Sequence, residues 1–301
     1  MKVTLNPKIT PFSLEPTLQC GQLFRWEKIN EWWYGVVQGK ILKIKQVGSE
    51  LLFEGVDEAF LKSYLRLDDN LLLILSQIGR DEHIKRAIQK FYGLRIVRQE
   101  PWECLISYMC STYKNIPAIK KAILNLSKRF GQKKTLDGYE FYTFPDSQEL
   151  AQASLKELEE CKLGFRTKHV LQVSTIVASG EFYLESLKRL DYENAKKRLM
   201  MLPGVGHKVA DCVLLFSLDK LEAFPVDVWI KRLILTYYKD NFEHLFIQRV
   251  LNKSGLSDSD YSRIGSFGRR YFGAYAGYAQ EYLFHFGRQL STLSLPLKTR
   301  A

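Results

Sequence analysis

The segment ENAKKRLMMLPGVGHKVADCVLLFSLDKLEAFPVDVWIKRLILTYY, residues 193–238, decides the fold of this chain. It begins with a short helical pattern that stops at Pro203, and the two glycines that follow, Gly204 and Gly206, permit a tight reversal of the backbone. Apolar side chains then recur at helical spacing, at Val209, Cys212, Val213 and Phe216. The segment predicts a helix, a glycine hairpin and a second helix, followed by a return loop and a third helix.

The hairpin LPGVG leaves several backbone N–H groups at the start of the second helix without partners inside the helix, at the positive end of its dipole. Such a position binds a DNA phosphate through the main chain, so it holds DNA without reading its sequence. We expect this contact from Gly204, Val205, Gly206 and His207. The alternative is a plain turn between two helices, which a G-x-G pattern alone does not exclude.

Lys208 lies in the first turn of the second helix, two residues after Gly206. A cation at a helix N-terminus is electrostatically disfavoured, so we expect its pKa to fall below the usual value of about 10.4. More of the amine is then neutral, and a neutral amine is a nucleophile. Taken by itself, Lys208 is also open to interpretation as a solvated lysine that binds phosphate.

Asp227, in FPVDVWIKRL, stands at the start of the third helical pattern. Taken alone, it is an N-cap carboxylate, which needs no catalytic explanation. The stretch between Lys208 and Asp227 is long enough for one helix and a return loop, which can bring the two side chains together across a cleft. One carboxylate can serve both as the N-cap and as the partner of the amine.

The composition favours a nucleic-acid partner. The 301 residues carry a formal net charge of +11 and a sequence pI near 9.3, which raises the local concentration of a polyanion. The basic residues are dispersed along the chain, so a merely basic protein without such a partner is the alternative. A hydrophobic content of 46% and a charged content of 26% are typical of a globular chain.

The five cysteines are widely spaced, at Cys20, Cys104, Cys110, Cys161 and Cys212. No pair has CxxC or zinc-ligand spacing, so the pattern predicts no metal cluster and favours a reducing compartment: cytoplasm or nucleoid, or the nucleus in a eukaryote. The opening residues hold no long apolar stretch, and runs such as 71–75 are too short to cross a bilayer. We therefore expect no membrane partner.

The period of the apolar pattern divides the chain into two parts. Residues 32–56 alternate apolar and polar side chains, with breaks at Gly and Ser, which predicts an antiparallel meander. From about Asp57 the period lengthens, and the remainder is predicted to be mostly helical. We expect an α+β fold, with an N-terminal antiparallel β-sheet domain over residues 1–95 and a mainly helical domain over residues 96–301.

The motif LPGVGHKVADC with PVDV resembles the helix-hairpin-helix, Gly/Pro-rich, aspartate (GPD) motif of DNA glycosylases, in the version of the 8-oxoguanine DNA glycosylase/AP lyase family. Four further segments are similar to that family: CGQLFRW at 20–26, RQEPWECLISYMCS at 98–111, KLGFRTKHV at 162–170 and GAYAGYAQEYLF at 273–284. The resemblance runs from about Leu18 to Arg288. It implies a TATA-binding-protein-like N-terminal domain and a helix-hairpin-helix GPD glycosylase domain.

The resemblance implies a bifunctional enzyme of base excision repair that acts on double-stranded DNA containing 8-oxoguanine. The base is flipped out, because its sugar is inaccessible inside the stacked duplex. Lys208 is then the amine that attacks C1′, and Asp227 deprotonates it and stabilises the sugar cation. The resulting Schiff base acidifies the C2′ hydrogen, so β-elimination nicks the strand. No cofactor is required for this chemistry.

The resemblance also assigns base-recognition residues, each of which has ordinary packing as its alternative. Cys212 and Phe284 sandwich the flipped purine, beside Pro225, and Gln280 meets its Watson–Crick edge one turn before Phe284. The carbonyl of Gly21 accepts a hydrogen bond from N7–H, which guanine lacks. An unpaired carbonyl against guanine costs on the order of 1–3 kcal/mol, enough to discriminate between the two bases.

The remaining assignments concern DNA and a cation. Phe165 and Arg166 face the estranged base and wedge the stack, although Arg166 alone is equally consistent with a phosphate contact. Leu202 and Val205 offer hairpin carbonyls to a structural monovalent cation. The chain departs from the better-known eukaryotic pattern of consecutive asparagines and an arginine, and these places hold Tyr113, Lys114, Asn115 and Ala118. Tyr113 and Asn115 remain candidate DNA contacts, and a relaxed preference for the opposite base is expected.

Two further departures affect one predicted contact region. Family members have His two residues after the aspartate and Asp near position 287, whereas this chain has Trp229 and Gly287. The phosphate contact next to the lesion must therefore be organised differently.

Two rival interpretations remain open from the sequence. One is a glycosylase for another damaged base, although the C-terminal region lacks the four close cysteines that hold an iron–sulfur cluster in the endonuclease III type. The other is a non-catalytic helix-hairpin-helix module that only grips DNA, against which Lys208 and Asp227 together argue. We expect a monomer, because DNA would occupy the cleft.

Overall fold

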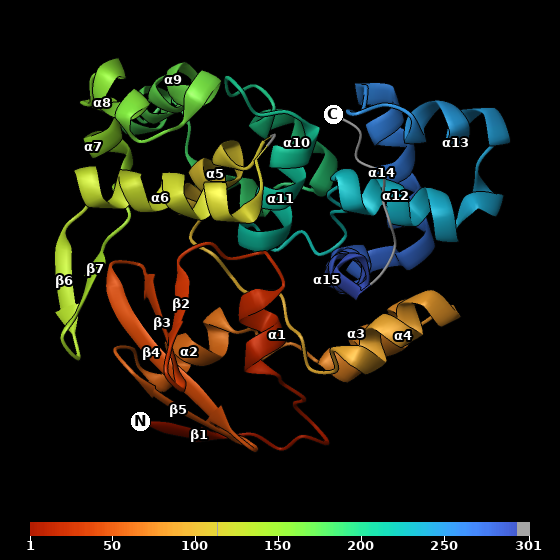
Figure 1. Ribbon diagram of the computed structural model, residues 1–301, viewed down its shortest axis with the longest axis horizontal. Coiled ribbons are helices and arrows are strands. Elements are labelled where there is room, and N and C mark those ends of the chain that lie inside the picture. Colours follow the sequence, from red (N-terminus) through yellow and green to blue (C-terminus); the bar gives the residue numbers. More distant parts are fainter. Residues whose placement is uncertain (113, 294–301) are drawn as a thin grey trace.

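The structure is a computed structural model that describes the backbone of residues 1–112 and 114–293, with side chains as far as residue 289. Tyr113, one of the predicted DNA contacts, lies outside the described residues. The predicted α+β class is confirmed: a small antiparallel sheet near the N-terminus adjoins a larger helical part (Figure 1). No helix in the described ranges combines the length and the apolar character needed to span a membrane.

The N-terminal sheet has five strands, all antiparallel, in the order β1-β5-β4-β3-β2. Its elements are β1 (Lys2–Thr4), α1 (Leu14–Gln19), β2 (Trp26–Ile29), β3 (Trp32–Val37), β4 (Lys40–Val47), β5 (Glu50–Glu54) and α2 (Glu58–Tyr64). The predicted meander corresponds to β3, β4 and β5. Their inward side chains, including Leu42, Ile44 and Leu51, form one core with Leu61 of α2, as expected when every second residue of a strand faces one side.

The helical part follows this sheet. Its helices are α3 (Leu71–Ile78), α4 (Glu82–Lys90), α5 (Pro101–Cys110), α6 (Ile116–Phe130), α7 (Ser147–Ala151), α8 (Leu155–Glu160), α9 (Thr167–Ala178), α10 (Tyr192–Leu199), α11 (His207–Ser217), α12 (Val228–Tyr237), α13 (His244–Leu251), α14 (Asp258–Phe272) and α15 (Ala276–Leu293). Short 3-10 turns also occur, among them η1 (Gly164–Arg166). Most of the buried apolar side chains of these helices form a second, larger core.

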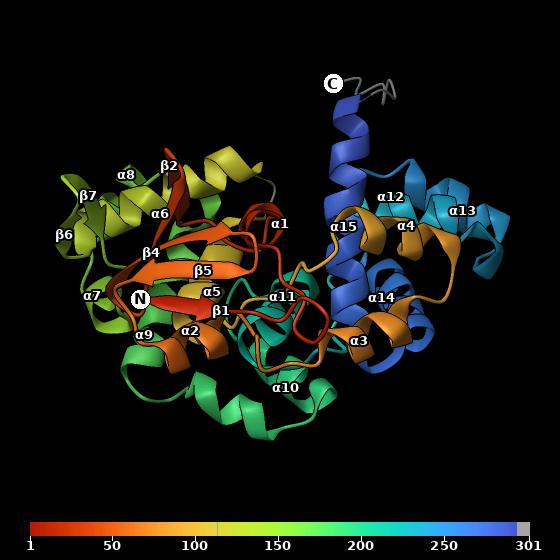
Figure 2. The same ribbon diagram turned by 90° about the horizontal axis from the view of Figure 1, so that it is seen from below.

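Helices α3 and α4 precede residue 95 but pack on the larger core. Leu71, Ile74, Ile78 and Ile84 are buried there, and both helices contact α15. Figures 1 and 2 show α3 and α4 beside α15, apart from the sheet. Residues 1–95 therefore contribute to both cores. The predicted division of the chain near residue 95 stays a prediction.

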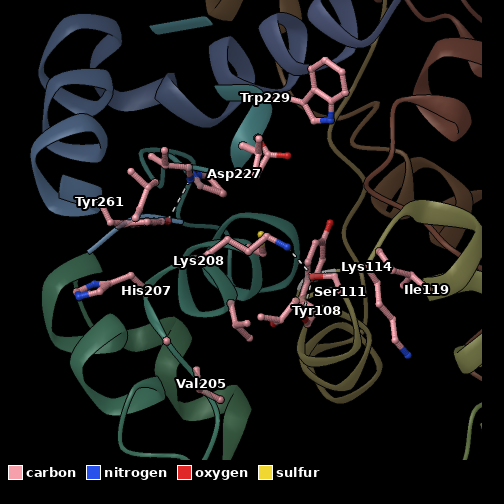
Figure 3. Close-up of a pocket in the computed structure, with 18 of the residues that line it drawn as sticks. Tyr108, Ser111, Lys114, Ile119, Val205, His207, Lys208, Asp227, Trp229 and Tyr261 are labelled. Carbon is pink, nitrogen blue, oxygen red and sulfur yellow. Dashed lines mark hydrogen bonds between the residues drawn. The ribbon is translucent and has the colours of Figure 1, made fainter. Parts of the chain in front are cut away.

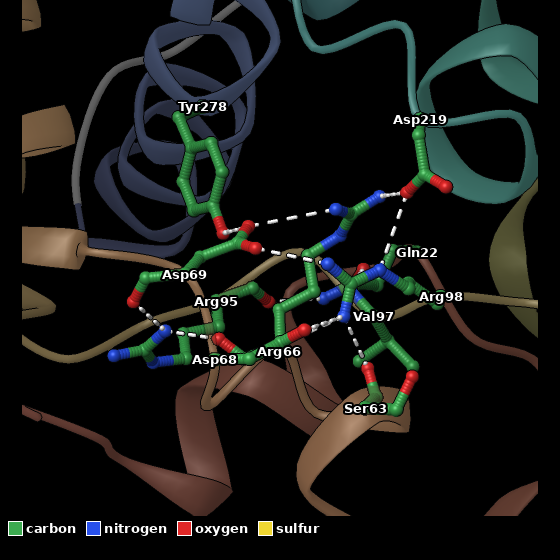
Figure 4. A network of polar contacts seen from close by, with 10 residues as sticks. All are labelled: Gln22, Ser63, Arg66, Asp68, Asp69, Arg95, Val97, Arg98, Asp219 and Tyr278. Atoms are coloured by element: carbon green, nitrogen blue, oxygen red, sulfur yellow. Dashed lines mark hydrogen bonds and ion pairs between the residues drawn. The ribbon is translucent and has the colours of Figure 1, made fainter.

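A buried polar network ties the N-terminal segment to the helices (Figure 4). The guanidinium group of Arg98 pairs with Asp69 at 2.9 Å and with Asp219, just after α11, at 3.3 Å. Arg66, only 1% exposed, pairs with the same two carboxylates. The Tyr278 hydroxyl of α15 donates to Asp69. Because an unpaired buried charge is costly, these contacts hold α11 and α15 in one position relative to the N-terminal segment.

One element differs from the sequence expectation. A two-stranded hairpin, β6 (Lys133–Leu136) and β7 (Tyr139–Tyr142), lies in a region expected to be helical. Its turn is Asp137–Gly138, both with positive φ, which is the geometry that Asp-Gly favours between two strands. The Asp137 carboxylate accepts from the Tyr34 hydroxyl at 2.8 Å, so the hairpin is held against the N-terminal sheet.

Candidate active site

The glycine hairpin lies between α10 and α11, as the sequence predicted. Gly204 has a φ of +77°, and a Cβ atom there would lie 2.7 Å from the ring of His169 on α9. Both observations exclude a larger residue. Gly206 is the N-cap of α11 and supplies no side-chain acceptor, so the first amides of that helix are open to a ligand. The hairpin therefore presents backbone donors at a positive helix end.

Lys208 is held by a serine of another helix. Its Nζ donates to Ser111 Oγ at 2.5 Å, and the Ser111 hydroxyl donates to the Tyr108 carbonyl at 2.7 Å (Figure 3). Because the serine hydrogen is used on that carbonyl, Ser111 acts only as an acceptor toward the lysine. The lone pair of a neutral amine at Lys208 therefore stays available to a reaction partner.

Asp227 reaches the same pocket from the start of α12. Its side chain caps this helix by accepting from the Ile230 amide at 2.8 Å. Burial raises the pKa of the Asp227 carboxyl, while the Ile230 amide and then the charge of Lys208 lower it. The Lys208 amine donates to Ser111. Its charge acts on the Asp227 carboxyl within the same pocket.

Tyr261 of α14 links the loop before Asp227 to α11. Its hydroxyl accepts from the Val226 amide at 3.1 Å and donates to Asp211 at 2.7 Å. Asp211 is only 1% exposed and lies three residues after Lys208. The Tyr261 ring also stacks on His207, with centroids 5.3 Å apart. Tyr261 therefore contacts both the residue before Asp227 and the helix that carries Lys208.

The Asp211 carboxylate is fully used by this network. It also accepts from the Tyr192 hydroxyl at 2.6 Å and from Lys196 Nζ at 2.8 Å. A buried charge that is paired and hydrogen-bonded in this way fixes its partners firmly. The network therefore holds α10, α11 and α14 together immediately behind the hairpin.

The pocket has a volume of about 1250 Å³ and lies between α5 and α6, the hairpin, the start of α12, and α15. This exceeds the roughly 300–1,000 Å³ typical of small-molecule pockets, so a nucleoside with part of its backbone can enter. Most predicted site residues line it: Gly21, Asn115, Leu202, Gly204, Val205, Gly206, His207, Lys208, Cys212, Pro225, Asp227, Gln280 and Phe284. The hairpin and α15, distant in sequence, thus form opposing parts of one site.

The predicted base-recognition residues have suitable surroundings. Burial raises the pKa of Cys212 to about 12, so its thiol is neutral and acts as an apolar wall rather than a nucleophile. Gln280 is 5% exposed, and its Oε1 atom has no hydrogen-bond partner among the described residues. Gly21 has a φ of +115°, and a Cβ atom there would lie 2.9 Å from Phe284 Cε1. Both observations favour glycine at this position.

Phe165 and Arg166 do not line the pocket. Phe165 is 64% exposed, whereas Arg166 is 5% exposed, with its guanidinium carbon 4.1 Å from the Phe165 ring centroid. Arg166 also donates to the Leu163 carbonyl at 3.1 Å. In this structure the aromatic ring faces outward, and Arg166 would have to leave its packing to reach a base. Asn115 uses its side-chain oxygen to cap α6, accepting from the Ala118 amide at 3.0 Å.

One of the two departures from the family pattern, Gly287, has an explanation in the packing of α15. A Cβ atom at Gly287 would lie 2.6 Å from Leu233 Cδ1, because α15 packs closely on α12. An aspartate at this place would require the Leu233 side chain to move. Arg288, the next residue, lines the pocket instead and donates to the Cys20 carbonyl at 2.9 Å. Trp229 lines the same pocket from the first turn of α12 (Figure 3).

Several pocket residues were missed from the sequence. Ser111, Tyr108 and Tyr261 lie near Lys208 and Asp227 only through packing of α5, α11 and α14, which no local pattern reveals. Glu281 and Arg288 could have been identified from the sequence, because they stand three residues before and four residues after Phe284 and thus share its helix face. A scan of α15 at helical spacing would have found them.

Comparisons with known proteins agree with this geometry. Residues 4–105 match the family described as 8-oxoguanine DNA glycosylase, N-terminal domain, and residues 106–241 match the HhH-GPD superfamily base excision DNA repair protein. An N-glycosylase/DNA lyase of Saccharomyces cerevisiae is 32% identical over 90% of this chain and 82% of its own length. N-glycosylase/DNA lyase OGG1 of Arabidopsis thaliana is 30% identical over 91% and 77%.

A solved structure agrees as well. The 8-oxoguanine glycosylase/lyase of Clostridium acetobutylicum, in complex with double-stranded DNA containing cytosine opposite 8-oxoguanine, superposes with a TM-score of 0.82 at 32% identity. The superposition covers 93% of each chain. Together with the hairpin, the pocket that holds Lys208 and Asp227 and the N-terminal sheet, these similarities show that the chain belongs to the N-glycosylase/DNA lyase family of the helix-hairpin-helix GPD superfamily.

Proposed function

We propose that this protein excises 8-oxoguanine from double-stranded DNA and then cleaves the strand at the resulting site, as a bifunctional DNA glycosylase and AP lyase of base excision repair. The observation that carries the proposal is the placement of the Lys208 amine and the Asp227 carboxyl in one pocket that is large enough for a flipped nucleotide. Both are supported by residues of other elements, so their geometry exists before DNA binds.

DNA is held mainly through its backbone. The open amides at the start of α11, in Gly206 and His207, bind a phosphate of the damaged strand together with the hairpin residues Gly204 and Val205. The net charge of +11 raises the rate of encounter with DNA. Phe165, exposed on η1, wedges into the stack, while Asn115 and Arg166 contact DNA nearby.

The glycosylase step forms one bond and breaks another. The lone pair of Lys208 Nζ attacks C1′ as the bond from C1′ to N9 breaks, and the base leaves with that electron pair. Asp227 takes the proton that the amine loses and stabilises the positive charge that develops on the sugar. The carboxyl is suited to the proton transfer because burial raises its pKa toward neutrality.

The lyase step follows from the covalent product. Opening of the sugar ring gives a Schiff base between Lys208 and C1′, and its positive nitrogen acidifies the C2′ hydrogen. When this proton is removed, its electron pair forms a double bond between C2′ and C3′, and the C3′–O bond breaks to release the 3′ phosphate. Strand cleavage therefore requires the same lysine as base removal, and the side chains of this chain suffice for both without a cofactor.

The base is recognised by pocket residues other than the reacting pair, including two residues of α15. Cys212 and Phe284 sandwich the purine beside Pro225, and the amide of Gln280 meets its Watson–Crick edge. The Gly21 carbonyl accepts from N7–H of the oxidised base. The unpartnered oxygen of Gln280 supports this assignment, because a buried polar atom of this kind calls for a partner.

The Leu202 and Val205 carbonyls hold a structural monovalent cation at the hairpin. The Leu202 carbonyl accepts one hydrogen bond, from the Val205 amide at 3.1 Å, so one of its two lone pairs remains for an ion. Replacement of potassium and sodium by tetramethylammonium at constant ionic strength should weaken DNA binding. Unchanged binding would argue against the ion. The expected monomeric state and a location in cytoplasm, nucleoid or nucleus stay predictions.

The experiment that tests the function is single-turnover excision from a duplex with one 8-oxoguanine. Lys208→Gln should lose excision and strand cleavage together, because both steps need the amine. The matched control is Lys220→Gln, which removes a lysine outside the pocket whose amine donates to the Lys188 carbonyl at 2.9 Å. If the wild-type chain binds this duplex but leaves its base and strand intact, the non-catalytic module is favoured.

A further inference from the structure

A second buried carboxyl group faces the pocket, and the reaction described above does not use it. Glu281 is only 2% exposed, lies next to Gln280 on α15, and is among the pocket-lining residues. Its Oε1 atom has no hydrogen-bond partner within the described part of the chain. Buried carboxylate oxygens are almost always partnered, so this atom is expected to meet a ligand.

Glu281 lies on the same face of α15 as Phe284, which is predicted to contact the base. Glu281, Phe284 and Arg288 follow the i, i+3, i+7 spacing of one helix face. The charge of this carboxyl raises the pKa of three nearby groups, Cys20, Tyr108 and Cys212. It therefore lies on the side of the pocket where Cys212 and Phe284 would enclose a purine.

The charge state of Glu281 allows it to act as an acceptor. Burial is the main cause that raises the pKa of its carboxyl to about 7; the charge of Asp227 adds to this effect, and Cys20 and Arg288 oppose it. A substantial fraction is therefore ionised near neutral pH, and hydrogen-bond donors on a ligand would favour that form further. The Cys20 thiol hydrogen-bonds this carboxyl, so Oε1, which has no partner within the described part of the chain, is the acceptor left for a donor on the ligand.

We propose that Glu281 reads the Watson–Crick edge of the flipped purine together with Gln280: Glu281 accepts a hydrogen bond from the 2-amino group, and Gln280 Oε1 accepts one from N1–H. The proposal rests on the function given above. A guanine-type edge presents these two donors side by side and so satisfies both buried oxygens. An adenine-type edge lacks the 2-amino group and has an acceptor at N1, which the Gln280 oxygen repels. The pair therefore selects an oxidised purine with a 2-amino group.

The test compares two substrates that differ only in that group. Single-turnover excision is measured on duplexes with 8-oxoguanine and with 8-oxoinosine, which lacks the 2-amino group but keeps N1–H, O6 and N7–H. The wild-type protein should prefer 8-oxoguanine by about tenfold or more, the effect expected when a buried acceptor loses its donor. In Glu281→Ala the ratio of the two rates should fall to about one.

Two further variants keep the test decisive. Glu281→Gln keeps the size of the side chain but replaces a charged acceptor by a weaker, neutral one, so its ratio should also fall severalfold if Glu281→Ala is too unstable to assay. Glu103→Gln removes another glutamate, partly buried and paired with Arg25 at 2.8 Å outside this pocket, and should keep the wild-type ratio. A merely structural role of Glu281 would change both rates alike.

The outcomes separate the two proposals. A wild-type ratio retained in a folded Glu281→Gln variant overturns the role of Glu281 but leaves the glycosylase function standing. A wild-type protein without preference between the two substrates also overturns it. A wild-type protein that removes neither base contradicts the proposed function itself.

Discussion

The two sides of the pocket differ in how their polar groups are satisfied. On the hairpin side, Lys208 donates to Ser111 and Asp227 accepts from the Ile230 amide, so both groups are positioned before DNA arrives. On the α15 side, Gln280 and Glu281 each keep a buried oxygen without a partner among the described residues. The hairpin side is therefore preorganised for chemistry, whereas the polar groups of the α15 side need a ligand as their hydrogen-bond partner.

This contrast has a direct consequence for variants. Changes on the hairpin side should lower the rate for every substrate, because they remove or misplace the reacting groups. Changes on the α15 side should alter the relative rates among bases, because they remove groups that only the base satisfies. A variant that breaks this division would show that the two sides are not separate in function.

The largest effect is expected for Asp227→Asn. Asparagine caps a helix about as well as aspartate, so α12 should remain intact. It cannot take the proton of the amine or stabilise the sugar cation, so the single-turnover rate should fall by about 10²–10⁴-fold on both 8-oxoguanine and 8-oxoinosine. A rate within about twofold of wild type, in a protein with unchanged thermal stability, would remove Asp227 from the mechanism.

A smaller effect is expected for Tyr261→Phe. Loss of the hydroxyl leaves the Val226 amide and Asp211 without that partner, which should lower the free energy of unfolding by about 1–3 kcal/mol. The loop that carries Asp227 then loses its anchor, so excision should fall by about tenfold for both bases. Chemical denaturation and single-turnover kinetics measure the two effects.

Tyr271→Phe is the matched control for Tyr261→Phe. Tyr271 lies on the same helix, α14, and its hydroxyl donates to Asp81 at 3.1 Å, outside the pocket. It should lose some stability but keep the wild-type excision rate. Equal losses of activity in the two variants would mean that general stability, not the anchor, explains the effect.

The smallest effect concerns the pH dependence of stability on the α15 side. Burial raises the pKa of Glu281 in the folded state to about 7, from the ordinary 4.5. Between these values the folded state keeps a proton that the unfolded chain has lost, so this contribution to stability is present at low pH and is lost as pH rises toward 7. Glu281→Gln has no such proton to lose.

The difference between the two proteins therefore isolates this group. The free energy of unfolding of Glu281→Gln minus that of wild type should rise by about 1–3 kcal/mol between about pH 5 and about pH 8. Cys20, Tyr108, Cys212, Asp227 and Arg288 face the carboxyl from other elements or its own helix and are common to both proteins. A difference that does not change with pH would show that Glu281 is not proton-linked.

The parts of the site that could be predicted from the sequence are local ones. Gly204, Gly206 and Lys208 belong to one continuous stretch, and the backbone rules for glycine and for helix ends apply there without knowledge of the fold. Asp227 was identified as an N-cap from its own helix, and the structure has it in that place. The two-part α+β organisation followed from the change in apolar period near Asp57.

The parts that could not be predicted depend on contacts between distant elements. Ser111 is the C-cap of α5 and meets Lys208 only because α5 and α11 pack together. The burial of Arg166 against Phe165 depends on the path of the chain at η1, where a basic residue is ordinarily expected at the surface. The Asp137–Gly138 turn was visible in the sequence, but its strands have too little alternation to separate them from a helix.

The central claim is that the amine of Lys208 bonds to the sugar. The most direct measurement is reduction with borohydride during the reaction on a duplex with one 8-oxoguanine, followed by peptide mapping of the trapped protein by mass spectrometry. We expect one modified peptide, with the sugar on Lys208 and none on Lys114 or Lys231, which also line the pocket. Modification at Lys114 or at the N-terminal amine, with Lys208 unmodified, would contradict the claim.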